Sequence, residues 1–94
     1  MSTFIIVASN IIDAEKLSQY SQQAALTVAK YEGKFIAKGP IDSLHGTPGY
    51  QGKAIIEFAD QQSAENWYHS DEYQALVPLR NEAIDCQFHL LNGL

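Results

Sequence analysis

The order in which hydrophobic periodicity changes along the chain constrains its fold more than any other feature. Four short runs of β-compatible residues lie at Phe4–Ser9, Lys34–Lys38, Lys53–Phe58 and Ile84–Leu91. Between the first and second runs, and again between the third and fourth, apolar residues recur at the steps typical of amphipathic helices. The order strand, helix, strand, strand, helix, strand predicts one α+β domain over residues 1–94, with helices on one face of an antiparallel sheet.

The first helix has recognisable ends. Asp13 lies where an N-cap is expected, and Glu15 adds a negative charge in the first turn. The apolar stripe of this helix comprises Leu17, Tyr20, Ala24, Val28 and Tyr31. Gly33 follows the stripe, at the position where a helix commonly ends in a left-handed residue.

The second helical region is divided. Asp60 predicts the N-cap of a helix that carries Ala64, Trp67 and Tyr68. Ser70 predicts the start of a further short helix through Arg80, in which Pro78 requires a kink or an early end. Residues 42–51, which contain two glycines and a proline, predict a long hairpin loop.

The strands carry apolar residues on both faces. If Phe4, Ile6 and Ala8 pack on the helices, Ile5 and Val7, together with Ile55 of the third strand, face outwards. Burial of a side chain of that size contributes about 1.5–3 kcal/mol. The pattern therefore predicts a homodimer joined through the sheet face, the alternative being a monomer with a few exposed aliphatic residues.

Composition excludes several classes of partner. The formal net charge is −5, which disfavours nucleic acid and anionic membranes as partners. The apolar run at the N-terminus is too short for a signal peptide or a membrane span. Cys86 is the single cysteine, so neither an intramolecular disulfide nor a cysteine-based metal site is expected. These features predict a cytoplasmic protein.

Two strand segments have the spacing of the RNA recognition motif. They are Ile6–Ile11 and Gln51–Phe58. That module stacks bases on exposed aromatic side chains, but this chain has Val7, Lys53 and Ile55 at the corresponding positions. The match therefore indicates a shared βαββαβ topology without RNA binding.

Three segments resemble the domain-of-unknown-function 1330 family. They are Tyr31–Gly39 (YEGKFIAKG), Ile55–Phe58 (IIEF) and Trp67–Leu76 (WYHSDEYQAL), the last followed by Arg80. The resemblance implies a ferredoxin-like βαββαβ sandwich that forms a dimeric α+β barrel. It also implies a superfamily that includes small cofactor-free monooxygenases, muconolactone isomerases and haem-dependent dismutases.

Aromatic residues and one arginine form the candidate ligand site. Trp67, Tyr73 and Arg80, with Tyr31 nearby on the first helix, provide aromatic walls and a guanidinium that can bind a carboxylate. The alternative is that Trp67 and Tyr73 are core residues and that Arg80 pairs with Glu82, Glu72 or a carboxylate of a partner. His45 is a further candidate, because the predicted loop is where functional residues concentrate.

Two functions from different classes fit these residues. One is a small homodimeric enzyme, similar to a monooxygenase or an isomerase, that acts on a small organic acid or aromatic molecule. The other is a non-catalytic ligand-binding or accessory module in which the same aromatics are packing residues. The three histidines lack metal-ligand spacing, and the glycines are typical of turns and caps, so neither a metal nor a cofactor is expected.

Overall fold

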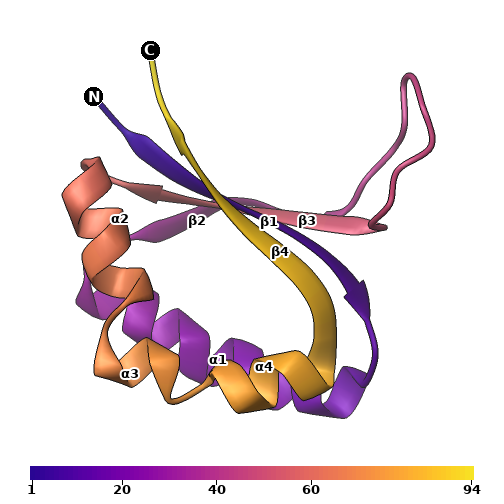
Figure 1. The fold of residues 1–94 in the computed structure, drawn as a ribbon, viewed down its shortest axis with the longest axis horizontal. Helices are drawn as coiled ribbons and strands as arrows, with labels where there is room; N and C mark the ends of the chain where they lie inside the picture. The colour runs from indigo at the N-terminus through magenta and orange to yellow at the C-terminus, as the bar shows by residue number, and fades with distance from the viewer.

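The computed structural model describes all residues, 1–94, as a four-stranded antiparallel sheet with every helix on one face (Figure 1). The strand order is β2-β3-β1-β4. The elements are β1 (Thr3–Ile11), α1 (Ala14–Lys30), β2 (Lys34–Pro40), β3 (Gly52–Phe58), α2 (Gln61–Tyr68), α3 (Asp71–Gln74), α4 (Val77–Ala83) and β4 (Ile84–Asn92). This arrangement confirms the predicted α+β, ferredoxin-like βαββαβ fold.

The predicted helix starts are confirmed by their capping hydrogen bonds. The side chains of Asp13, Asp60 and Ser70 each accept a hydrogen bond from the backbone N–H three residues later, at 3.1, 2.8 and 3.2 Å. The helix that begins after Ser70 ends within one turn, and α4 then begins at Val77. Pro78 lies in the first turn of α4, where its missing N–H leaves no hydrogen bond unmade.

The predicted faces of β1 are the wrong way round. Ile5 and Val7 are 5% and 8% exposed because they pack under the helices, whereas Phe4 and Ile6 lie on the helix-free face. Ile55 does face away from the helices, directly opposite Ile6. Consecutive residues of β1 are apolar, so alternation along the strand could not identify its buried side.

The end of α1 also differs from the prediction. The left-handed residue is Glu32, with φ of 63°, and not Gly33. Gly33 is required for a different reason, because a Cβ atom there would lie 2.5 Å from Cε1 of Phe58 and 3.0 Å from Cγ1 of Val28. Gly33 thus allows the chain to pass directly over the core.

The core lies between α2, the end of α1 and the sheet. Its fully buried large side chains are Trp67, Tyr73, Phe58, Ile56 and Val28. Trp67 lies at its centre, with its ring 4.3 Å from that of Tyr73 and 5.6 Å from that of Phe58. Strand β2, at the sheet edge, is almost entirely exposed.

The segment between β2 and β3 forms the predicted long loop. In Figure 1 it rises from the sheet on the side away from the helices. Leu44 and His45 lie on this loop and are exposed. The loop therefore extends beside the helix-free face of the sheet.

Candidate functional site: a cleft backed by a tyrosine–arginine cluster

A cleft of about 950 Å³ lies between α1 and the β1–β3–β2 part of the sheet. Its cause is the small size of the α1 side chains there, since Ser21, Ala24 and Ala25 all line the cleft. They cannot fill the space between a helix and a sheet, which is usually occupied by larger side chains. Tyr20 and Trp67 also contribute to its walls.

A bulge in β2 shapes the mouth of the cleft. The pairing of β2 with β3 shifts between Phe35 and Ala37, so Ile36 is an extra residue. Phe35 then lies opposite Ile56, and Lys38 lies opposite Ala54, on the face that is covered by the helices. Residues three apart would otherwise point to opposite faces. The Lys38 ammonium is 5.6 Å from the centre of the Phe35 ring, within cation–π range.

A cluster of tyrosines and Arg80 lies behind the inner wall of the cleft. The hydroxyls of Tyr20 and Tyr73 are 2.6 Å apart. Arg80 Nη1 donates to Tyr68 Oη at 3.1 Å and to Tyr73 Oη at 3.3 Å. The guanidinium also lies 4.8 Å from the centre of the Phe88 ring, and Phe88 lines the cleft.

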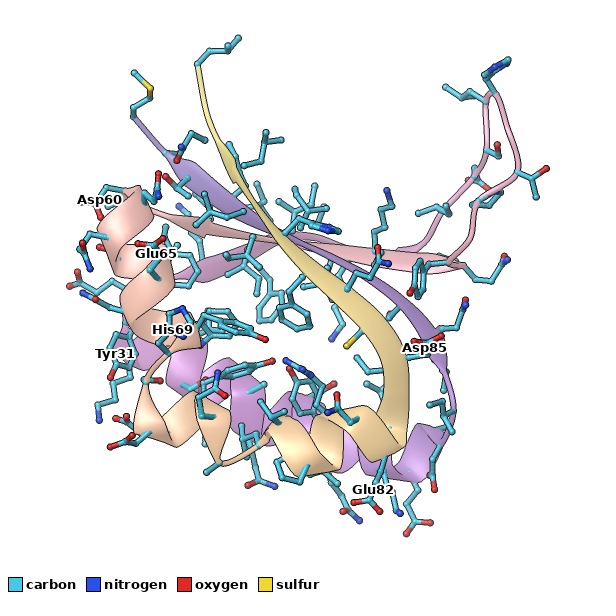
Figure 2. All side chains as sticks on the ribbon, viewed as in Figure 1. Tyr31, Asp60, Glu65, His69, Glu82 and Asp85 are labelled. Carbon is cyan, nitrogen blue, oxygen red and sulfur yellow. The ribbon has the colours of Figure 1, made fainter.

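Arg80 makes no ion pair. The carboxylates that the sequence offered it have other partners: Glu82 pairs with Lys16 at 2.8 Å, and Glu72 pairs with Lys30. Figure 2 shows Glu82 on the outer side of the helices. The alternative pairing of Arg80 with Glu82 or Glu72 is therefore wrong, and its guanidinium instead contacts hydroxyl oxygens, the amide oxygen of Asn81 at 3.2 Å and an aromatic ring.

The environment fixes the protonation states of this cluster. Burial raises the pKa of both Tyr20 and Tyr73 above the ordinary tyrosine value, and contact between the two adds to the effect at Tyr20. Burial alone would lower the pKa of Arg80, but its hydrogen bonds to Tyr73 and Tyr68 raise it overall. At neutral pH Tyr20 and Tyr73 are therefore neutral hydrogen-bond donors, and the guanidinium is charged.

Burial also raises the pKa of the Cys86 thiol, although the charge of Arg80 acts in the opposite direction. Cys86 lies opposite Ser9 of β1, which lines the cleft. At neutral pH this thiol is therefore protonated and a poor nucleophile.

The structure brings three of the five predicted site residues together. Trp67, Tyr73 and Arg80 form one cluster, and the Trp67 ring reaches the cleft. Tyr31 is elsewhere, donating to Glu72 at 3.3 Å and lying beside His69 on the outer side of the helices (Figure 2). His45 lies on the loop outside the cleft and is exposed.

Several cleft residues were not predicted from sequence. They are Tyr20, Phe35, Lys38 and Phe88. Tyr20 was identified only as a member of the helical stripe, because its hydroxyl partner is 53 residues away. Lys38 gave no signal, since its position depends on the bulge.

The cleft lining contains no acidic residue. It includes Lys38, Lys53 and Tyr20, and no Asp, Glu, His or Cys. Elsewhere in the chain, no group of three or more His, Cys, Asp or Glu side chains is placed to hold a metal ion. No helix has the length and hydrophobicity of a membrane span.

Together, the fold and the cleft define a ferredoxin-like α+β protein with a recess between its first helix and its sheet. The chain belongs to the family described as Domain of unknown function (DUF1330), whose model matches residues 2–94. No curated protein matches the chain in sequence.

Solved structures share this fold. A protein of unknown function from Rhodopseudomonas palustris, RPA0582, superimposes with a TM-score of 0.81 at 16% identity, over 99% of this chain and 82% of that one. SnoaB, a cofactor-independent oxygenase from Streptomyces nogalater, gives 0.73 at 8% identity, over 99% and 93%. A dimeric ferredoxin-like protein of unknown function from Jannaschia gives 0.71 at 10% identity, over 99% and 100%.

Proposed function

We propose that this protein binds a small aromatic molecule with an acidic oxygen in the cleft between α1 and the sheet. One observation carries the proposal: in a chain of net charge −5, the one charged side chain on the helix-covered side of the cleft is a lysine, Lys38, because Lys53 shares the helix-free face with Ile55 and lines the cleft only at its backbone. The remaining walls are largely apolar and include Phe35, Trp67 and Phe88. Apolar enclosure with a few placed polar groups is the usual form of a small-molecule site.

The position of the cations favours an acid over a neutral ligand. Lys38 lies over the Phe35 ring at the mouth of the cleft and makes no ion pair, so its ammonium is available to a ligand carboxylate or phenolate. A planar ring between Phe35 and the apolar wall would place its acidic group near Lys38. Arg80 is the carboxylate anchor expected from sequence, but it lies behind the wall, where its Nη1 donates to Tyr68 and Tyr73. Its positive charge therefore favours an acidic ligand without direct contact.

The fluorescence of Trp67 tests this proposal directly, because Trp67 is the only tryptophan and lines the cleft. Titration with 1-naphthoate should change its emission with saturation, and the uncharged methyl ester should bind more weakly. Ala25→Leu, which adds volume to an exposed cleft-lining position, should weaken binding. Ala29→Leu is the matched control, since Ala29 is an exposed α1 residue outside the cleft.

Two results would contradict the proposal. Wild-type emission that does not respond to either naphthalene compound would exclude this class of ligand. Equal binding by Ala25→Leu and Ala29→Leu would show that the compounds bind elsewhere.

A homodimer through the helix-free sheet face is part of the same proposal. That face carries the apolar residues Phe4, Ile6, Ile55 and Leu91, and Leu91 is 59% exposed in the single chain. Apolar side chains clustered in this way commonly mark an interface. The dimeric ferredoxin-like protein from Jannaschia supports the assignment. Light scattering behind a sizing column should give twice the chain mass, and a monomer mass would refute it.

Catalysis is the second candidate function, and the likeness to the cofactor-independent oxygenase SnoaB supports it. The cleft lining has no carboxylate, imidazole or thiol, so a base would have to be a lysine or the substrate itself. This shortage favours binding over catalysis. Oxygen uptake in the presence of hydroxylated naphthalenes would establish the oxygenase, and its absence with saturated protein would favour the binding module.

A cytoplasmic location completes the proposal, because Cys86 is the single cysteine and is a free thiol. Fractionation of the native host would test it, and recovery from the extracellular or periplasmic fraction would refute it.

A further inference from the structure

We propose that the Tyr20 hydroxyl donates a hydrogen bond to the acidic oxygen of the ligand, and that the charge of Arg80 polarises this hydroxyl through Tyr73. This inference rests on the proposed function, because it names the group that recognises the ligand in the same cleft. In a cleft that bound its ligand by aromatic contacts alone, no single hydroxyl would have this role.

The hydrogen-bond partners limit the possible order. Arg80 has only donors, so Tyr73 Oη accepts from it at 3.3 Å. Either hydroxyl of the Tyr20–Tyr73 pair, 2.6 Å apart, can donate to the other, and in both cases one hydroxyl proton has no acceptor in the protein. Of the two residues only Tyr20 lines the cleft, so we assign to the ligand-bound protein the order Arg80 to Tyr73 to Tyr20, which leaves the free proton on Tyr20.

This order leaves the Tyr20 proton without an acceptor in the protein. Tyr20 makes no side-chain hydrogen bond other than that to Tyr73. Its side chain is 7% exposed and lines the cleft, so a ligand oxygen there can complete the chain. A buried hydroxyl proton is costly to leave unpaired, and this cost favours a ligand with an acceptor at that point.

The charge of Arg80 strengthens the donor. The guanidinium has no carboxylate partner and lies 4.8 Å from the Phe88 ring, which itself lines the cleft. Hydrogen bonds arranged in a chain polarise one another, more so away from water. A donor backed in this way favours the ionised over the neutral form of a bound phenol.

The test uses 4-nitrophenol, whose absorbance reports its ionisation, and 4-nitroanisole, which cannot ionise. Bound to the wild type, 4-nitrophenol should ionise at lower pH than it does free in solution. Tyr20→Phe removes only the hydroxyl and should weaken binding of the nitrophenolate by about 10- to 100-fold, the range expected for a hydrogen bond to a charged group. Binding of 4-nitroanisole should be unchanged.

Two further variants test the chain of hydrogen bonds from Arg80 to Tyr20. Tyr73→Phe leaves Tyr20 in place but interrupts the chain, so the ionisation of the bound 4-nitrophenol should move towards its value in solution. Tyr31→Phe is the matched control, because its hydroxyl contacts Glu72 outside the cleft, and it should behave as the wild type.

The outcomes separate this inference from the proposed function. If the wild type binds both compounds but Tyr20→Phe binds nitrophenolate unchanged, the role of Tyr20 is refuted and the cleft assignment stands. If nitroanisole binding falls equally, Tyr20 acts only by shaping the wall, which also refutes it. If neither compound binds the wild type, the proposed function fails and the inference fails with it.

Discussion

Gly33→Ala should destabilise the protein although Gly33 has ordinary backbone geometry. The added Cβ would lie 2.5 and 2.7 Å from two carbons of the Phe58 ring, against a favourable separation of about 3.5 Å, so the ring must move about 1 Å. Phe58 is 1% exposed and packs on Trp67, which leaves it little room.

The expected magnitude follows from two opposing contributions. Overpacking a core costs about 1–3 kcal/mol, and loss of chain entropy in the unfolded state returns about 0.4–1 kcal/mol. Taking about 2 and about 0.7 kcal/mol, the net loss is about 1.3 kcal/mol. In a domain of this length that lowers Tm by about 5–10 °C. Because Phe58 contacts Trp67, the fluorescence of Trp67 should change as well.

Thermal unfolding followed by circular dichroism, at one fixed protein concentration, measures this effect. Gly49→Ala is the control, because no atom lies within 4 Å of a Cβ at that position, and its Tm should be unchanged or slightly raised. Phe58→Leu combined with Gly33→Ala should cost less than the sum of the two changes. A Gly33→Ala protein as stable as the wild type would refute the reasoning.

Three further predictions concern other parts of the molecule. The hydrogen bond from the Ser63 backbone lowers the pKa of Asp60 below its ordinary 3.8, so Asp60 stabilises the fold above that pH and loses this effect as the pH falls through the lowered value. Asp60→Asn should therefore reduce the loss of stability on acidification, as measured by urea unfolding at several pH values; an unchanged acid dependence would contradict it. Ile6→Asp, on the helix-free sheet face, should convert the proposed dimer to a monomer in light scattering, and a persistent dimer would mean that another surface is used. Cys86 should react with a thiol reagent more slowly than glutathione does at neutral pH, and more slowly still in Arg80→Gln, because Arg80 lowers the pKa of this thiol; equal rates in both proteins would mean that the charge does not reach it.

The parts of the fold that depend on neighbouring residues were predictable from sequence. The caps at Asp13, Asp60 and Ser70 are confirmed because a capping side chain bonds a backbone group three residues away. The four strands and their order along the chain are likewise confirmed. Each of these features needs only local periodicity or a turn residue.

The features that were missed depend on contacts between distant segments. The buried face of β1 is decided by the helices above Ile5 and Val7, and the sequence alternation there is ambiguous. Gly33 was assigned a conformational role because its contact with Phe58 lies 25 positions away along the sequence.

The candidate site could be predicted in part for the same reason. Trp67, Tyr73 and Arg80 are close in sequence and lie together in space. Tyr20 joins them only through the packing of α1, and Lys38 reaches the cleft only because of the bulge at Ile36. No local pattern encodes either contact.

The small side chains of α1 separate two properties that often conflict in evolution, the stability of the fold and the choice of ligand. Helix α1 is attached to the core by the Tyr20–Tyr73 contact and by the hydrogen bond from Trp67 to Thr27. Ser21 and Ala25 lie between these attachments and contribute little to the core. Substitutions there can change the size of an accepted ligand while the attachments persist. Members of one fold can thus diverge in what they bind without first acquiring compensating mutations for stability.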